Sequence, residues 1–266
     1  MKRKTNQASY FDDQFGIYDI RPGYPRALYE IIAKYKILNS RSNILEIGAG
    51  SGIASRELYS TWSSKMTLIE PGCNFYKILL RAFAGNEDVT IENTTFENYQ
   101  TPLVFDAIFS ATAFHWLDTS VKYKRSSELL KDDGLLILYW NNYWIDDVSI
   151  YNDIQTIYAK YGMGQNTEKS LLEIQQDKIE SRKREIDESG FFRVVEHSIF
   201  KNTFDYSLDN YIKLLRTFPD HSKLPENFFN EIIHAISLYG NKIQIRILTN
   251  LEIAEKIWKD RPINNI

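Results

Sequence analysis

The chain has 266 residues but a single cysteine, Cys73, and no long hydrophobic run. One cysteine excludes an intramolecular disulfide and any multi-cysteine metal site. No apolar stretch approaches the roughly 18 residues that a membrane-spanning helix requires. Lys2, Arg3 and Lys4 are not followed by the apolar segment of a secretory signal. These absences predict a cytoplasmic protein without membrane contacts.

An excess of positive charge is also missing. The formal net charge is -3, so the sequence lacks the excess of basic residues that is typical of proteins that bind nucleic acid. The basic run 182–184 stands among acidic residues and is typical of a solvated helix face. His197, His221 and His234 lack the spacing of metal ligands, so we expect no metal site.

Short apolar strands alternate with helical patterns up to residue 140, which is typical of a parallel sheet with right-handed crossovers. Strands are expected at 43–47, 66–70, 89–91, 105–109 and 135–140, and helices from Pro25, at 53–61, after Pro71-Gly72 and at 121–130. The last of these strands is continuously apolar, which indicates burial on both faces.

The regular alternation breaks after Trp140. Residues 141–190 are polar, rich in tyrosine and helical in pattern, and we interpret them as an insertion after the fifth strand. Strands are then expected at 192–204 and 242–249, and helices at 207–217 and 225–239. The two late strands are predicted to pair antiparallel at an edge of the sheet. The predicted fold is a Rossmann-like, doubly wound α/β sheet of seven strands, mostly parallel with an antiparallel edge strand, plus a helical lid insertion.

A glycine turn follows the first predicted strand, which carries Glu46. Gly48, Gly50 and Gly52 are spaced G-x-G-x-G, and Ile53 occupies the place of the third glycine of a dinucleotide fingerprint. A pyrophosphate requires that fingerprint, whereas a ligand without phosphate needs only a tight turn and close backbone approach. The positive end of the following helix suits a carboxylate.

An acid, Glu70, ends the second predicted strand. A carboxylate can accept hydrogen bonds from both hydroxyls of a ribose. Because parallel strands end at the same edge of a sheet, Glu70 and the glycine turn are expected to meet there. Together they predict a site for a nucleoside without a pyrophosphate.

The E-x-G-x-G-x-G motif, with a strand-end acid and a following proline, resembles the class I methyltransferases that use S-adenosylmethionine (SAM). Other segments are similar to the small-molecule branch, methyltransferase type 11, related to trans-aconitate and quinone methyltransferases. These segments are Tyr18-x-x-Arg21-Pro22-Gly23-Tyr24-Pro25, Ser110 to Leu117 and Leu129 to Leu136. The resemblance covers about residues 10–140.

Together, the pattern and the resemblance predict one domain over 1–266, with an N-terminal lid segment (10–40), a SAM-binding core (41–140), the helical lid insertion (141–190) and a C-terminal part completing the sheet (191–266). The resemblance alone implies SAM as methyl donor and S-adenosylhomocysteine (SAH) as product. The matching positions are Glu46, Gly48, Ala49 and Gly50 for the methionyl part, Glu70 for ribose, Pro71 and Phe96 for adenine, and Ser110 beside the methyl group. Arg21 would bind a carboxylate of SAM or of the substrate, or form a structural ion pair with Glu46 or Asp19.

Methyl transfer from a sulfonium requires mainly alignment and exclusion of water. A base is needed only if the acceptor must first lose a proton. His115 is the leading candidate, and its alternative is a hydrogen bond to the backbone or packing on Trp116. Tyr18 and Trp116 could face the sulfonium, because aromatic ring faces attract cations. Their alternative is ordinary lid and core packing.

The predicted reaction is methylation of a small-molecule acceptor by a monomer or homodimer. Two other functions remain open, namely methylation of protein or tRNA and SAM sensing without catalysis. The segment Ser110-Ala111-Thr112-Ala113 differs from the N/D-P-P-Y/F turn of DNA amino-methyltransferases. This difference argues against methylation of adenine or of cytosine N4 in DNA.

Overall fold

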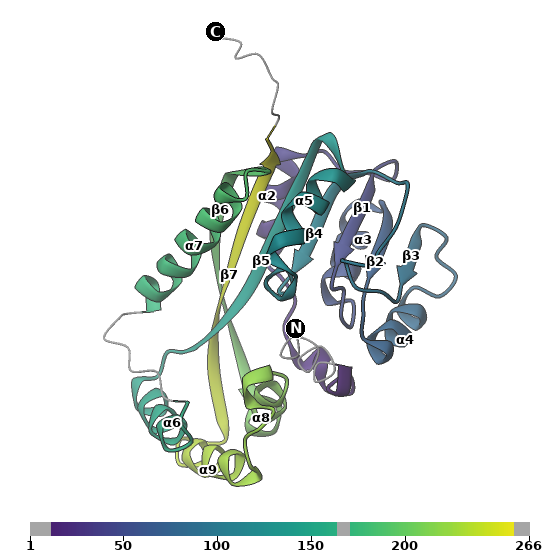
Figure 1. The fold of residues 1–266 in the computed structure, drawn as a ribbon. Helices are drawn as coiled ribbons and strands as arrows, with labels where there is room; N and C mark the ends of the chain where they lie inside the picture. Colours follow the sequence, from purple (N-terminus) through teal and green to yellow (C-terminus); the bar gives the residue numbers. More distant parts are fainter. Residues whose placement is uncertain (1–11, 164–170, 258–266) are drawn as a thin grey trace.

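The computed structural model describes residues 12–163 and 171–257. Seven strands form one sheet in the order β3-β2-β1-β4-β5-β7-β6 (Figure 1). The strands are β1 (Asn43–Ile47), β2 (Lys65–Ile69), β3 (Val89–Glu92), β4 (Phe105–Ala111), β5 (Leu130–Ile145), β6 (Phe192–Ser207) and β7 (Lys242–Lys256). Neighbours from β3 to β5 are parallel, whereas β7 is antiparallel to both β5 and β6. The predicted seven-stranded sheet with antiparallel pairing at one edge is confirmed.

Helices cover both faces of the sheet. In chain order they are η1 (Tyr18–Ile20), α2 (Arg26–Tyr35), α3 (Ile53–Trp62), α4 (Cys73–Ala82), η2 (Phe114–Trp116), α5 (Thr119–Leu129), α6 (Val148–Lys160), α7 (Leu171–Glu188), α8 (Leu208–Arg216), η3 (Pro219–His221) and α9 (Glu226–Ser237). Within the described ranges, every helix is too short or too polar to cross a bilayer.

Alternate residues of the central strands belong to two separate cores. Ile44 packs with side chains of α2, α3 and α4, whereas Leu45 packs with α5 and α7 on the other face. Successive side chains of a strand point to opposite faces. Burial on both faces therefore explains why these strands are almost continuously apolar.

The strands β5, β6 and β7 are longer than the sequence predicts and extend beyond the other strands (Figure 1). They pack there with α6, α8 and α9 in a third core. The expected strand 135–140 ended too early, because the polar residues after it have partners across the sheet. Asn141 Oδ1 accepts from Thr249 Oγ1 at 2.6 Å, and Asn142 Nδ2 donates to the Leu248 carbonyl at 3.3 Å. The insertion of α6 and α7 therefore begins after Ile145.

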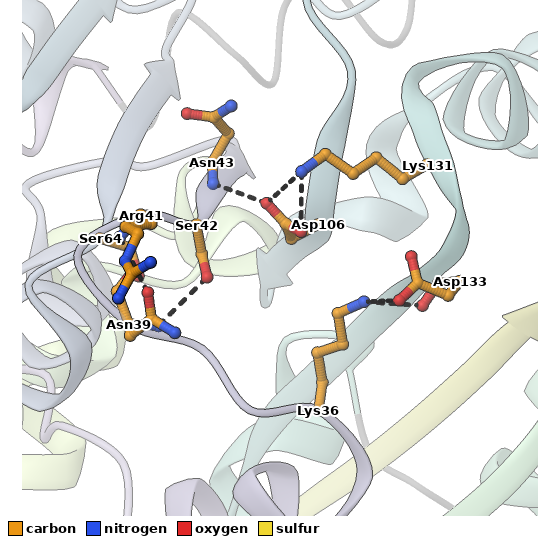
Figure 2. Close-up of polar contacts among 9 residues, drawn as sticks. All are labelled: Lys36, Asn39, Arg41, Ser42, Asn43, Ser64, Asp106, Lys131 and Asp133. Atoms are coloured by element: carbon orange, nitrogen blue, oxygen red, sulfur yellow. Dashed lines mark hydrogen bonds and ion pairs between the residues drawn. The ribbon is translucent and has the colours of Figure 1, made fainter.

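Charged contacts hold together the edge at which the parallel strands begin (Figure 2). Asp106 accepts from the Asn43 backbone N–H at 2.8 Å and from Lys131 Nζ at 2.9 Å. Lys36 Nζ lies 2.6 Å from the Asp133 carboxylate. These contacts join β1, β4 and β5 at one edge and leave the opposite edge for the glycine turn.

Candidate active site

The glycine turn follows β1 at the carboxyl edge of the sheet. Gly48, Gly50 and Gly52 have φ angles of 72°, 57° and 83°, in the left-handed region that glycine adopts without penalty. A Cβ atom at Gly48 would lie 2.5 Å from the Cβ of Ala113. Both the backbone conformation and the loop after β4 therefore require glycine at this position.

Replacement of Gly48 by alanine is expected to lower the free energy of unfolding by about 2–5 kcal/mol. A side chain in the left-handed region costs about 1–2 kcal/mol, and overpacking adds about 1–3 kcal/mol. Gly85→Ala is the matched control, because Gly85 has a φ of 76° but no atom near its Cβ position. Urea denaturation compares the two variants, and equal losses would show that the contact with Ala113 has no energetic weight.

Glu70 lies immediately after β2 and links the two loops of the site. Its Oε2 accepts from the Gly50 N–H at 2.8 Å, and its Oε1 accepts from the Gly72 N–H at 2.7 Å. Burial raises the pKa of Glu70 to about 7, although both amides favour the ionised form. Asn93 Nδ2 donates to the carbonyl oxygens of Glu70 and Pro71 at 2.9 and 3.2 Å. The acid is therefore held in one position at the edge of the sheet.

Glu46 is a buried acid with one unsatisfied oxygen. Its Oε2 accepts from Ser55 Oγ at 2.6 Å, and its Oε1 has no hydrogen-bond partner among the described residues. Burial raises the pKa of Glu46 to about 8, and the nearby Glu70 adds to the effect. An unpaired buried acceptor costs about 1–3 kcal/mol. Because Glu46 lines the cavity at the turn, a bound donor group would remove that cost.

The N-terminal segment covers the glycine turn. The Tyr18 ring lies 3.9 Å from the position of a Cβ at Gly50, and its centre is 4.9 Å from that of Phe75 in α4. Tyr24 shares a hydrogen bond of 3.1 Å with Thr112 Oγ1. The covered cavity has a volume of about 40 Å³, which is much smaller than the roughly 300–1,000 Å³ of typical ligand sites.

Arg21 joins this segment to the C-terminal part of the chain. Its Nε and Nη2 donate to Thr217 Oγ1 and to the Thr217 carbonyl, both at 2.9 Å. The guanidinium lies 4.7 Å from the centre of the Tyr18 ring and 5.0 Å from that of Phe218. The ion pair with Glu46 or Asp19, one of the alternatives from sequence, is not formed. These contacts leave N–H groups of the guanidinium for a ligand.

The structure gathers many of the predicted site residues around this one cavity. Its lining includes Tyr18, Arg21, Glu46, Gly48, Ala49 and Gly50, together with Thr112, Asn141 and Tyr143, which were not predicted. Asn141 Nδ2 donates to the carbonyls of Pro22 and Gly23, both at 3.4 Å. Asn141 therefore ties the N-terminal segment to β5. Thr112 has a φ of 57°, and such strain at a non-glycine residue is concentrated at functional sites.

Comparisons with known proteins agree with this geometry. Residues 45–138 match the family of the methyltransferase domain. A relative in Dictyostelium discoideum, named as a methyltransferase, is 29% identical over 157 residues, which span 57% of each chain. An uncharacterised methyltransferase of Schizosaccharomyces pombe is 24% identical over 259 residues, covering 92% of this chain and 94% of that protein.

The fold comparison points the same way. A solved type II methyltransferase from Anaeromyxobacter dehalogenans has a TM-score of 0.64 at 18% identity, covering 88% of this chain and 97% of that one. These similarities support a class I SAM-dependent methyltransferase, with the methyltransferase domain matched over residues 45–138. The glycine turn and Glu70 therefore lie where a doubly wound sheet binds its ligand, outside the carboxyl ends of the strands.

Four residues that the resemblance assigned to SAM do not line the cavity, and one of them, Glu70, holds the glycine turn instead. Ser110 Oγ donates to the Ile47 carbonyl at 3.0 Å and bridges β4 to β1. The Phe96 ring is 1% exposed and packs in the core. Pro71 is exposed beside Glu70. Core packing of Phe96 was not apparent from its loop position in the sequence.

His115 and Trp116 also lie outside the cavity, in η2 after β4. His115 Nδ1 accepts from Trp140 Nε1 at 3.1 Å, and the rings of His115 and Trp116 are 4.5 Å apart. Desolvation and the cations Arg182 and Lys122 lower the pKa of His115 to about 4, although the residue as a whole is exposed. A group with so low a pKa and an occupied acceptor is a poor general base at neutral pH.

Proposed function

We propose that this methyltransferase transfers a methyl group from SAM to a small-molecule acceptor. The observation that carries this proposal is the enclosure of the glycine turn by the N-terminal segment and by Asn141 and Tyr143 of β5. An acceptor that reaches an enclosed site must be small, whereas a protein or tRNA substrate would need an open groove. The net charge of -3 also disfavours tRNA.

The charges of the cavity match those of the methionyl part of SAM. We assign the ammonium to Glu46, whose Oε1 has no other partner among the described residues, and the carboxylate to Arg21. Glu70 would accept from the ribose hydroxyls, and Pro71 would lie beside the adenine. When bound, SAM supplies a methyl group that is already activated by the sulfonium charge. The protein's own contribution is to orient the reactants and exclude water.

A nucleoside does not fit the covered cavity without movement of the N-terminal segment. Tyr18 and Arg21 line it from the N-terminal segment, and Asp12 Oδ1 accepts from the N–H groups of Asn74 and Phe75 at 2.7 and 3.1 Å. Asp12 thus fastens the segment to the start of α4, close to Glu70. We propose that this segment opens to admit SAM and then closes over it, as the predicted N-terminal lid.

The fate of a labelled methyl group tests the proposed function. The protein is incubated with methyl-deuterated SAM and a cell extract, which is then separated into small molecules, protein and RNA for mass spectrometry. Label in the small-molecule fraction supports the proposal. Label confined to protein or RNA identifies a macromolecular methyltransferase, and SAH binding without any labelled product identifies a SAM sensor.

His115→Asn is expected to reduce this labelling by less than about tenfold. General acid–base catalysis contributes about 10²–10⁴-fold, and the lowered pKa of His115 is unsuited to that role. The rate of label incorporation at saturating SAM measures the effect. A loss of more than 100-fold, with unchanged SAH affinity, would restore His115 as the base.

A further inference from the structure

A second cavity, of about 350 Å³, lies between the extended half of β5 and the helices α6, α8 and η3. Its volume is within the range of about 300–1,000 Å³ that small-molecule sites occupy. One part of its wall comes from the end of β5 and the insertion that follows it. The rest comes from the C-terminal part of the chain. This cavity is therefore large enough for a ligand of its own.

The second cavity adjoins the glycine-turn cavity. Tyr143 lines both of them. The centre of the Tyr143 ring is 5.1 Å from that of the Phe218 ring. The guanidinium of Arg21 lies 5.0 Å from the centre of the same Phe218 ring. Tyr143 thus forms the wall between the two cavities at one point, and the contact of Phe218 with Arg21 forms it at another.

Aromatic rings form much of the wall of the second cavity. Trp144 and Tyr151 stack at 5.1 Å with an interplanar angle of 24°, and the other aromatic residues of the lining are Tyr143, Tyr158, Tyr211 and Phe218. Flat rings pack well against such walls, in offset or edge-to-face arrangements. The shape of the lining favours an aromatic ligand.

The polar groups of the lining indicate a ligand without negative charge. Asp220 is its one carboxylate, and no lysine or arginine belongs to the part of the lining that the structure describes. His221 is 7% exposed, and its Nε2 shares a 2.6 Å hydrogen bond with the Tyr158 hydroxyl. His221 Nδ1 has no partner among the described residues, and burial lowers the pKa of His221 to about 4, which keeps the ring neutral.

We propose that the second cavity binds the methyl acceptor, that the acceptor is an uncharged aromatic molecule bearing a hydroxyl group, and that the Tyr158–His221 pair is its hydrogen-bonding anchor. This inference rests on the proposed function, because the cavity adjoins a methyl donor only if SAM binds at the glycine turn. Methyl transfer requires the acceptor atom to meet the methyl carbon in line with the sulfur, so the Tyr143 side chain, which lines both cavities, turns aside when donor and acceptor are both bound.

Calorimetry on the SAH-saturated protein tests the inference with two matched probes, 2-naphthol and its anionic counterpart 2-naphthoate. We expect 2-naphthol to bind at least tenfold more tightly than 2-naphthoate. Gln155→Trp, which places an indole in the cavity from a half-buried position of α6, is expected to weaken 2-naphthol at least tenfold and leave SAH binding unchanged. Thr156→Trp, at an exposed position of the same helix, is the control and should change neither affinity.

The outcomes separate the two proposals. Failure of SAH to bind the wild type overturns the proposed function and this inference with it. If SAH binds normally, three results overturn the inference alone. These are no binding of 2-naphthol, a preference for 2-naphthoate, and an unchanged affinity of Gln155→Trp for 2-naphthol. His221→Phe keeps a ring in place and should weaken 2-naphthol by about three- to tenfold, since one hydrogen bond contributes about 0.5–1.5 kcal/mol. An unchanged affinity in that variant would remove the anchor.

Discussion

Glu70→Gln is expected to weaken SAH binding by about 100-fold or more. A hydrogen bond to a charged group contributes about 1.5–3 kcal/mol, and the ribose would make two of them. The amide would also direct its NH₂ toward the Gly50 or Gly72 N–H, which now lie 2.8 and 2.7 Å from the carboxylate oxygens. Two donors then face each other, and the glycine turn loses its support. Calorimetric titration with SAH measures the change.

Two controls separate loss of the ribose contact from general damage. Glu92→Gln alters the exposed acid that ends the neighbouring strand β3 and should change SAH affinity by less than twofold. A 2′,3′-dideoxy analogue of SAH should bind the wild type much more weakly than SAH, but Glu70→Gln should hardly distinguish the two ligands. If the variant still prefers SAH as strongly as the wild type does, the ribose is bound by another residue.

The parallel half of the fold was predictable because its signals are local. The strand that contains Ile44 and Leu45 is buried on both faces and is mostly apolar apart from Glu46, and the glycine turn that follows requires left-handed angles. Each such unit of strand, turn and helix is contained in a short stretch of sequence. The sheet order then follows from right-handed crossovers between parallel strands.

The extent of the antiparallel half was not predictable in the same way. The pairing of β5 with β7 continues to Ile145 and Ile245, past polar residues that look like the end of a strand. Asn141 and Asn142 are tolerated there because their amides meet partners on β7. Those partners are more than 100 residues away in the sequence, so a local sequence pattern cannot predict them.

The residues of the site also differ in how far the sequence predicts them. The glycine turn and the two acids could be found from spacing, because backbone geometry restricts what those positions can hold. Tyr143 was assigned to the insertion because the end of β5 was placed too early. The contact of Arg21 with Thr217 joins residues separated by 196 positions. Residues that shape the acceptor side therefore depend on tertiary contacts that only the folded chain reveals.

SAH affinity is expected to rise by about tenfold for each pH unit between about pH 7 and pH 8, to rise more steeply below pH 7, and to level off above pH 8. Burial raises the pKa of Glu46 to about 8, so this carboxyl is protonated in the free protein at lower pH. Pairing with the ligand ammonium requires the ionised form, and binding therefore releases a proton. Glu70, with a pKa raised to about 7, adds to the slope below that pH.

The same pKa shift fixes the sign of the effect on stability. A carboxyl whose pKa is raised on folding binds more protons in the folded than in the unfolded chain, so its contribution to stability is present below about pH 4.5 and is lost as pH rises toward about 8. SAH pairs with the ionised form and offsets that loss. The increase in melting temperature caused by saturating SAH should therefore be larger at pH 8 than at pH 6.

Glu46→Gln tests which carboxyl carries the proton. Glutamine has nearly the same shape, can still accept from Ser55 Oγ, and does not titrate. The variant should bind SAH at least tenfold more weakly at pH 8, and any remaining pH dependence should end near pH 7, where Glu70 titrates. Titrations in two buffers of different ionisation enthalpy count the protons released at pH 7.5, which should fall from about one to about a quarter. If the variant keeps the wild-type profile, the proton comes from another group and Glu46 does not hold the ammonium.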